Sequence, residues 1–524
     1  GRLGNDTQIA AIKSAGNVLS PGDPLDGILA QSVGGGGGQG GNARTFSNQT
    51  SGAANNGSQT ITVNVGGSGA NGSSGNMVDV TNTGTIATYG VESHGIRAQS
   101  IGGGGGNGGM VMNGALQGSG DSLNATFNVG GSGAVGGASS SVTVLNEGLI
   151  YTTGARSTGI MAQSLGGGGG NAGLIMDVTL GGTSTATSQS VTVNIGGSGG
   201  AGGVSGDVTV TNRSTGATNS GRITTLGEAA HGIFAQSLSG GGGNGTSILS
   251  FSGLRGSSGS TTVGLNLGGI GGVSGTAGNV HVINDGIIET SGAGAHGIFA
   301  QSTAGGGGNG GLVLSAAGIL GAGPAGGSVV SVGGQGGNGG NAGDVTVDNS
   351  GTIVTRGTRA HGILAQSVGG GGGNAQLAIG VSTNPATFLA TGALNARLGA
   401  GNGSVGGRGG DITVNHTGDI TVLGDGSQAI KVESINGGGG SITFEIGNVI
   451  ASIPTPSFMD GNAPLAGAIS SSRLGADSVS DMQSGAVTVT TLGNLGAAGN
   501  NGAGSAGQSI GGGGGTLDMV LDLV

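Results

Sequence analysis

The chain has 524 residues, a formal net charge of −10 and only 7% charged residues. Such sparse charge excludes a basic nucleic-acid-binding stripe and a dense acidic tail. Aromatic residues make up 2% of the chain, and Trp and Cys are absent, which removes stacking platforms, disulfides and thiolate metal sites. Gly accounts for 136 residues and Pro for 7, a composition that indicates disorder unless the sequence is periodic.

One phrase recurs along the chain and makes it periodic. The phrase runs Gly-Ile-x-Ala-Gln-Ser-x and continues into a tract of about five Gly, and its first copy begins at Gly27. The seventh copy is degenerate and has Glu433 in place of the Gln. Successive copies lie 64 to 75 residues apart. The recurring Gln occupies Gln31, Gln99, Gln163, Gln236, Gln301, Gln366 and Gln508. We predict a structural role for it, either in an amide ladder or in binding backbone groups of turns.

These copies divide the chain into a single array of repeats. A partial first repeat covers residues 1–41. The others cover 42–109, 110–173, 174–246, 247–311, 312–376, a degenerate repeat at 377–440 and a divergent repeat at 441–524. One long repeat is explained by an insertion between Asn212 and Asn219, and the last by a Pro-containing segment around Pro454, Pro456 and Pro464. We expect both insertions to lie between strands.

Each repeat predicts the same elements in chain order. A short apolar strand follows the Gly tract, as at residues 110–112, and a second strand, as at 62–65, leads into Gly-Gly-Ser-Gly. A third strand alternates β-branched residues, as at 208–211, and an Ile-containing segment later leads into the recurring phrase. An Asn-x-Gly turn lies between the third strand and the Ile-containing segment, and we expect its Asn to tolerate positive φ. The turns are at Asn82, Asn146, Asn219, Asn284 and Asn349.

The repeats show no helical periodicity, and one repeat alone cannot bury the faces of its strands, whereas stacked repeats can share a core. The sequence therefore predicts an all-β fold, an elongated parallel β-solenoid of about seven long glycine-rich repeats. With about three coils per repeat and ~4.8 Å between stacked strands, each repeat would rise about 14 Å and the whole chain about 100 Å. The core would be thin and made of Val, Ile, Leu and Ala. We expect the Gly tracts to be ordered against the strands in a conformation related to polyproline II, with a flexible linker as the alternative.

The extended phrase His-Gly-Ile-x-Ala-Gln-Ser-x-Gly-Gly-Gly-Gly-Gly-Asn, nearly intact from His94, His231, His296 and His361, resembles the glycine-rich repeats of autotransporter passenger domains in Gram-negative bacteria. The resemblance implies a β-helical rod on or outside the cell, exported through a C-terminal outer-membrane barrel and active in adhesion, aggregation or biofilm formation. Neither a signal peptide nor a barrel is recognisable here, so we expect any targeting signal or anchor to lie outside this chain.

Candidate sites point to structure rather than chemistry. Equivalent positions to the four His hold Asp26, Thr158 and Gln428, and a rise of about 14 Å would keep the rings too far apart to share a metal. We therefore expect structural hydrogen bonds there. Asp207, Asp344 and Asp411 occur once per repeat, which is too seldom for a calcium-binding nonapeptide array. Without clustered charges we predict neither catalysis, a metal nor a cofactor.

One apolar stripe is a candidate association surface. The position two residues before the recurring Gln points away from the Ile of the same phrase. It is occupied by Leu29, Met161, Phe234, Phe299 and Leu364, with Arg97 and Lys431 as exceptions. If the Ile face is the core, this stripe is either covered by the Gly tract or exposed for association.

The sequence therefore predicts a non-enzymatic extracellular structural or adhesive rod. A self-assembling filament subunit is the alternative, and an ice-binding or calcium-binding solenoid fits less well. Expected partners are other copies or further repeats end to end, because the chain starts and stops within a repeat, together with a host or abiotic surface. Nucleic-acid binding and a membrane span in this chain are not expected.

Overall fold

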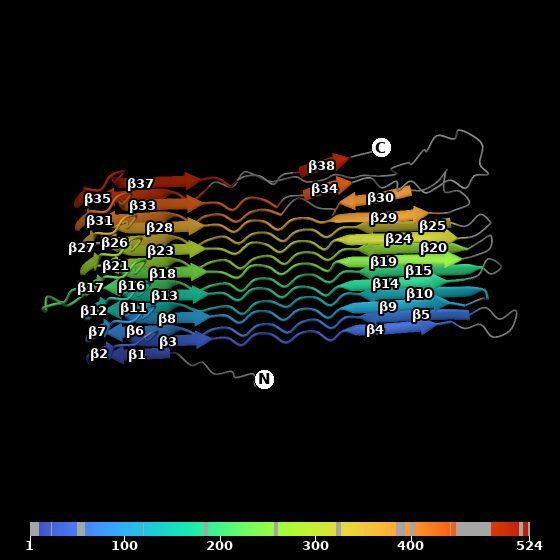
Figure 1. Cartoon of the computed structure of the whole chain (residues 1–524), viewed down its shortest axis with the longest axis horizontal. Helices are drawn as coiled ribbons and strands as arrows, with labels where there is room; N and C mark the ends of the chain where they lie inside the picture. The colour runs from blue at the N-terminus through green and yellow to red at the C-terminus, as the bar shows by residue number, and fades with distance from the viewer. Residues whose placement is uncertain are drawn as a thin grey trace.

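The computed structural model describes residues 10–22, 24–49, 58–118, 120–182, 187–255, 260–320, 326–383, 393–398, 404–440, 442–446, 484–512 and 517–521. The regular elements of this part of the chain are strands, and nearly all of them pair in parallel with the equivalent strand of the next repeat. The predicted all-β parallel solenoid is confirmed. Figure 1 shows two groups of strands at opposite ends of the molecule, joined by wavy segments.

Three eight-stranded parallel sheets, A, B and C, form a prism at one end. Sheet A contains β1 (Ala10–Ser14), β6 (Val78–Asn82), β11 (Val142–Asn146), β16 (Val208–Asn212), β21 (Val280–Asn284), β26 (Val345–Asn349), β31 (Ile412–His416) and β35 (Val487–Thr491). Sheet B contains β2 (Val18–Ser20), β7 (Thr85–Thr88), β12 (Leu149–Thr152), β17 (Arg222–Thr225), β22 (Ile287–Thr290), β27 (Thr352–Thr355), β32 (Asp419–Val422) and β36 (Asn494–Ala497). Sheet C contains β3 (Ile28–Val33), β8 (Ile96–Ile101), β13 (Ile160–Leu165), β18 (Ile233–Leu238), β23 (Ile298–Thr303), β28 (Ile363–Val368), β33 (Gln428–Ile435) and β37 (Ala503–Ile510).

Two further sheets, D and E, face each other at the opposite end as a sandwich. Sheet D contains β4 (Ala43–Asn48), β9 (Val111–Gln117), β14 (Ile175–Gly181), β19 (Ile248–Arg255), β24 (Val313–Leu320), β29 (Leu377–Thr383) and the antiparallel β30 (Ala393–Leu398). Sheet E contains β5 (Ser58–Val65), β10 (Ser122–Val129), β15 (Ser188–Ile195), β20 (Thr261–Leu267) and β25 (Gly326–Val332). A separate pair joins β34 (Ile442–Ile446) to β38 (Leu517–Leu521).

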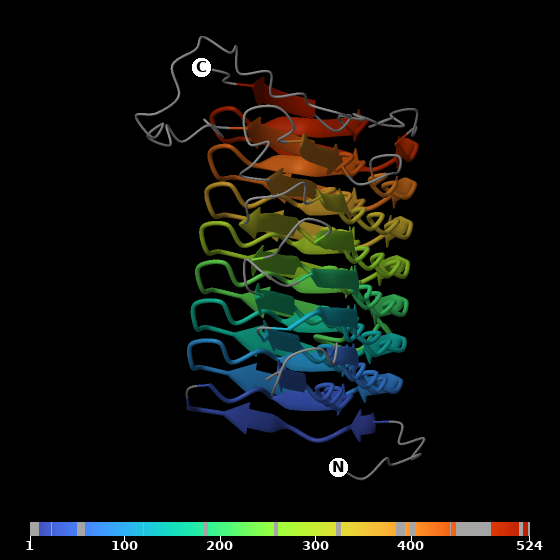
Figure 2. The same cartoon turned by 90° about the vertical axis from the view of Figure 1, so that its right-hand side faces the viewer.

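Each repeat makes one coil, not three, and the expected rise is corrected accordingly. Gln31 is the direct strand partner of Gln99, which belongs to the next repeat. Equivalent residues of neighbouring repeats are therefore about 4.8 Å apart, and the seven steps between eight coils give a stack about 34 Å high. Figure 2 shows the coils as stacked rungs, and the molecule is longest along its strands. Each coil needs about 65 residues because it passes through both groups of strands, which lie at opposite ends of the molecule (Figure 1).

The prism has the predicted thin aliphatic core. Columns of Val from sheet A, Ile from sheet B, and Ile and Ala from sheet C are fully buried, as at Val144, Ile150, Ile160 and Ala162. The Gly that opens each phrase lets this core close, because a Cβ on Gly95 would meet the Ile150 side chain at 2.4 Å. The Ile face of the recurring phrase is thus the core face.

Two glycine-rich tracts join the prism to the sandwich in every coil. The outgoing tract leads from sheet C to sheet D (residues 34–42 in the first coil), and the return tract leads from sheet E to sheet A (residues 66–77). Gly34, Gly37 and Gly40 donate N–H groups to the coil above at 2.7–2.8 Å, and Gly67 and Ala70 donate to the outgoing tract at 2.8 Å. This three-residue period is that of polyproline II. The tracts are ordered as expected, and the linker alternative is wrong.

Packing of the tracts explains which Gly positions cannot carry a side chain. A Cβ on Gly105 would lie 2.0 Å from the carbonyl oxygen of Ala134 in the return tract, and one on Gly106 would lie 1.9 Å from the Gly38 oxygen below. On Gly104 the nearest atom would be 3.9 Å away, because this third face points to solvent. Gly105 therefore excludes a side chain, whereas Gly104 does not.

The turn Asn residues have another purpose than the expected positive φ. Among the described residues, Asn219 has a φ of 65°, whereas Asn82, Asn146, Asn284 and Asn349 are not in that region. Their buried amides instead hydrogen bond to each other from coil to coil at 2.7–2.8 Å, and Asn212 fills this position in the repeat where Asn219 was expected. Residues 213–221 form the predicted insertion between β16 and β17. The Pro-containing insertion around Pro454 lies outside the described residues.

Candidate functional site

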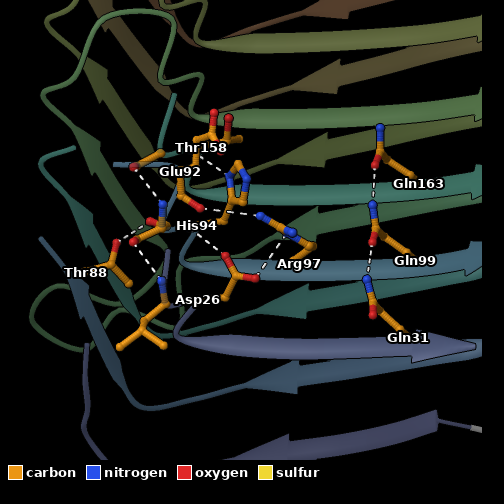
Figure 3. A network of polar contacts seen from close by, with 12 residues as sticks. Asp26, Gln31, Thr88, Glu92, His94, Arg97, Gln99, Thr158 and Gln163 are labelled. Atoms are coloured by element: carbon orange, nitrogen blue, oxygen red, sulfur yellow. Dashed lines mark hydrogen bonds and ion pairs between the residues drawn. The ribbon is translucent and has the colours of Figure 1, made fainter. Parts of the chain in front are cut away.

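One coil per repeat turns every recurring residue into a column along the stack. The recurring Gln side chains form such a column on the outer face of sheet C (Figure 3). Each Nε2 donates to the Oε1 of the Gln one coil above, at 2.5 Å between Gln31 and Gln99 and 3.1 Å between Gln301 and Gln366. Gln366 donates to Glu433 at 2.6 Å, and Gln508 is the strand partner of Glu433. An amide ladder therefore explains this position.

The Ser after each Gln ties sheet C to the start of sheet A. Ser164 Oγ donates to the Ser140 carbonyl at 2.9 Å and accepts the Gly206 N–H at 2.8 Å. Equivalent Ser hydroxyls do the same in the following coils. In the six coils between the first and the last, the Ser of the phrase is fully buried and acts as a structural bridge.

The His column is also a hydrogen-bonding device. Nδ1 of His94 accepts the Thr158 N–H at 3.0 Å, and Nδ1 of His231 accepts the N–H of His296 at 3.1 Å (Figure 3 shows the former). His296 and His361 repeat this contact. The structural role is as expected, but the reasoning from distance was wrong, because the rings of His231, His296 and His361 stack with centroids 5.0 Å apart.

These rings are held neutral. Burial lowers the pKa of His94 and His231 to about 4 and that of His296 to about 3, and it also lowers the pKa of His361. For His94 and His296, neighbouring positive groups lower the pKa further. A neutral ring keeps the lone pair on Nδ1 that accepts the N–H from the next coil.

Charged exceptions to the columns are compensated by one another. Asp26 stands at the first His position, where its carboxylate accepts the His94 N–H at 2.9 Å and pairs with Arg97 at 3.1 Å (Figure 3). Burial raises the pKa of Asp26, and the His94 N–H and the Arg97 charge oppose that shift. Lys431, at the Arg97 position of a later coil, pairs with Glu433 at 3.0 Å. Each of these charged departures from the repeat is thus paired with a residue of opposite charge.

The Asp residues considered for calcium cap the backbone of the return tract. Asp207 accepts the N–H of Asn279 at 2.7 Å, and Asp344 accepts that of Asp411 at 2.8 Å. Asn107 of the outgoing tract does the same for Asn171 at 2.8 Å. Within the described part of the chain no group of three or more His, Cys, Asp or Glu is placed to hold a metal ion.

The apolar stripe of sheet C lies on the outer face beside the His column. Leu29 is 51% exposed, Met161, Phe234 and Phe299 are half-buried, and Leu364 is buried. Phe234 lies 5.9 Å from the His231 ring and 5.1 Å from Phe299. The Gly tract continues in line with these strands (Figure 1). The ring contacts of the stripe come from the His column and from the Phe residues of the stripe itself.

Sheets D and E form a largely inside-out sandwich: most of its buried side chains are polar, although sheet D also buries one apolar column, which consists of Val111, Ile175, Ile248, Val313 and Ala378. In β10 the side chains of Ser122, Asn124, Thr126 and Asn128 are buried between the sheets, whereas Phe127 is 42% exposed. The same alternation holds in β15, where Thr192 and Asn194 are buried and Ile195 is exposed. On sheet D, buried Ser250 and Ser252 flank the exposed Phe251. The sequence did not lead us to predict this surface.

A second buried Asn ladder makes the polar interior possible. Asn64, Asn128 and Asn194 each donate from Nδ2 to the Oδ1 of the Asn one coil above at 2.7–2.8 Å, so that Asn266 accepts the last of these bonds. Thr45 of sheet D donates to Asn64 at 2.5 Å across the sandwich. Because equivalent residues stack in register, identical amides satisfy each other without solvent.

One ionisable group is buried in this interior. Asp177 of β14 is 1% exposed and accepts a hydrogen bond from Asn113 at 2.6 Å. Burial raises the pKa of its carboxyl group, and hydrogen bonds from Asn113, Asn128 and Asn194 oppose that shift. The position is filled by Thr45, Asn113, Ser250 or Ser315 in other coils, so the carboxylate is not needed for the fold.

The strands of the sandwich contain few charged side chains besides Asp177. Its strands from β4 to β25 contain two others, Arg44 and Arg255. The ion pairs of the described residues lie in the prism or next to it, as for Arg213 with Glu147 and Arg222 with Glu289. The molecule therefore has one charged end and one end with apolar outer faces.

No family model, curated protein or solved structure matches the chain. In the part of the chain described, the structure contains no helix long and apolar enough to cross a membrane.

Proposed function

We propose that this chain is a non-enzymatic structural and adhesive component outside a Gram-negative bacterium, which supports adhesion, aggregation or biofilm formation. The repeated phrase supports this setting through its resemblance to autotransporter passengers. The columns of Gln, Ser, His and Asn support a structural role, because each has a hydrogen-bonding partner in the stack.

The observation that carries the adhesive role is the inside-out sandwich. Monomeric soluble proteins rarely expose contiguous apolar patches larger than a few hundred Å². Here Val63, Phe127 and Val263 are exposed on sheet E, while Phe46 and Phe251 are exposed on sheet D. Two such faces at the end away from the ion pairs suit contact with an apolar surface or with another protein.

Ice binding is less well supported by the geometry. It needs a flat exposed array of Thr, but Thr62, Thr126 and Thr192 of sheet E are buried inside the sandwich. The Asp residues that suggested calcium are occupied with backbone N–H groups. A self-assembling subunit is the second candidate, since the same apolar faces favour it.

The test presents the sandwich end to defined surfaces. Because the chain has no Cys, Glu228→Cys gives a single coupling position at the prism, where this residue is exposed. Beads coated through this position are passed over alkylated and hydrophilic glass in flow. We expect at least tenfold greater retention on the alkylated glass.

The control variant carries Phe127→Lys and Phe251→Lys, one change on each outer face. Its beads should lose this preference while circular dichroism shows the same strand content. Equal retention of wild-type and variant beads would reject an adhesive role for the sandwich.

A further inference from the structure

We infer that the outer face of sheet E binds a second copy of this chain, with the two E faces packed against each other. The inference deepens the proposed function and rests on it only for the setting outside the cell. The partner follows from the shape, size and composition of this face.

The E face is a nearly unbroken apolar grid. Two columns of outward side chains run through all five strands without a polar residue. They are Val63, Phe127, Val193, Leu265 and Val330, and Val65, Val129, Ile195, Leu267 and Val332. The outer face of sheet D is interrupted, since Gly114, Gly253 and Gly318 stand where its columns need side chains. Sheet E is thus the better of the two faces for close packing.

The apolar surface of sheet E continues onto the return tract. Val135, Val204, Ile270 and Val273 point outward from this tract and are 44 to 51% exposed. The outgoing tract beside sheet D instead presents the Gly and Asn columns, as at Gly104 and Asn107. The apolar patch is therefore larger on the E side of the molecule.

The size of the patch matches a protein interface. Five strands about 4.8 Å apart, each of seven or eight residues with a rise of about 3.3 Å per residue, give a face of roughly 600 Å² for sheet E alone. Two such faces bury roughly 1,200 Å², the lower limit of a standard specific interface, and the return tract enlarges this area. The sheet by itself reaches the area that a stable dimer needs.

A second E face is also the best geometric match. Both copies have the same ~4.8 Å strand spacing and the same columns, so that side chains of one sheet can interdigitate with those of the other at a sheet separation of ~10 Å. A contact of one patch with its own copy has twofold symmetry and closes as a dimer. No charged residue stands in the apolar columns, so that none is desolvated by the contact.

A lipid bilayer fits this face less well. In the described order of sheet E, β5 is an outermost strand. Burial of the sheet in hydrocarbon would bring edge N–H and C=O groups into an environment without hydrogen-bond partners. Face-to-face contact with a second copy leaves this edge at the rim of the interface, in water.

The experiment compares two matched double variants by sedimentation velocity across a concentration range. The E variant is Phe127→Lys with Val263→Lys, at positions 42% and 48% exposed, and the D variant is Phe251→Lys with Leu314→Lys, at 46% and 45%. We expect wild type and D variant to dimerise and the E variant to show at least a hundredfold weaker dimerisation. Thermal unfolding shows whether each variant is folded.

Three results would overturn the inference. A wild-type chain that stays monomeric at all concentrations excludes the dimer, and equal weakening by both variants excludes sheet E as its site. Flotation of the wild type with phosphatidylcholine vesicles, without dimerisation, would assign the face to lipid. Dimerisation that is lost in the E variant, together with bead adhesion unrelated to the sandwich, would support the inference and reject the proposed function.

Discussion

Each coil passes through two regions that use the same strand spacing with opposite side-chain placement. In the prism, Val144 and Ile150 are buried and charged side chains such as Glu147 and Arg213 lie outside. In the sandwich, Asn128 is buried and Phe127 lies outside. The difference shows that burial in a stacked array does not follow from hydrophobicity alone. Where identical amides stack in register, a polar column satisfies itself and can occupy the interior.

The largest expected effect is a loss of stability at low pH that arises in the prism, where the His column lies, and not in the sandwich. Replacement of His94, His231, His296 and His361 by Gln, the residue at position 428 of the same column, should remove the acid sensitivity of the prism. Their folded pKa values lie below the ordinary 6.5, so the unfolded chain binds more protons as pH falls from about 6.5 to 4. His94, His231 and His296 then each cost up to about 3 kcal/mol of stability at pH 4, and His361 acts in the same direction.

Chemical unfolding of wild type and the quadruple Gln variant between pH 7 and pH 4 measures this effect. We expect wild-type stability to fall steeply over this window and that of the variant to fall much less. Parallel curves for the two proteins would show that the His column does not set the acid sensitivity.

The next effect concerns the tracts that connect prism and sandwich. Gly105→Ala should destabilise the chain by about 3 kcal/mol or more, because the new Cβ meets the Ala134 carbonyl oxygen at 2.0 Å. Gly104→Ala is the matched control, since its Cβ has no neighbour nearer than 3.9 Å. Thermal unfolding of both variants measures the difference, and equal melting temperatures would contradict the packed polyproline II layers.

A pair of Thr substitutions tests the comparison directly. Ile150→Thr in the prism should cost about 2–4 kcal/mol, because it removes apolar atoms from a fully buried site and adds a hydroxyl there. Phe127→Thr on the outer face of the sandwich should change the stability of the monomer by less than about 0.5 kcal/mol. Denaturant unfolding at low protein concentration measures both, and a large loss for Phe127→Thr would show that this side chain belongs to a core.

The sequence predicted the strands and their order well, because the alternation of β-branched residues acts locally. It did not predict the number of coils per repeat, since a spacing of about 65 residues does not say how much of it lies in the extended Gly tracts. Nor did it predict the inverted sandwich. Alternation in Thr62-Val63-Asn64-Val65 defines two faces but not which one is buried. The available signal was the Asn at Asn64, Asn128, Asn194 and Asn266, which recurs in register as a ladder requires.

The smallest expected effect has a pH dependence opposite to that of the His column and arises in the sandwich. Burial raises the folded pKa of Asp177, so the folded chain holds its proton more tightly than the unfolded chain does. The stability that this provides is complete below the ordinary pKa of 3.8 and is lost as pH rises through the raised folded value. Asp177→Asn supplies an amide that can join the polar interior without a charge. We expect the variant to be more stable than wild type at pH 7, by about 1–3 kcal/mol, the cost of an unfavourably buried polar group.

The measurement is the difference in unfolding free energy between Asp177→Asn and wild type at several pH values. This difference should shrink toward zero as the pH approaches 3.5, and because the His residues are common to both proteins their titration cancels. Ser250 and Ser315 occupy the same column in later coils, so that Asp177→Ser gives a second neutral variant of smaller volume. If both neutral variants were less stable than wild type at pH 7, the ionised carboxylate would be a favourable part of the interior, and its hydrogen bonds to Asn113 and its neighbours would outweigh the cost of burial.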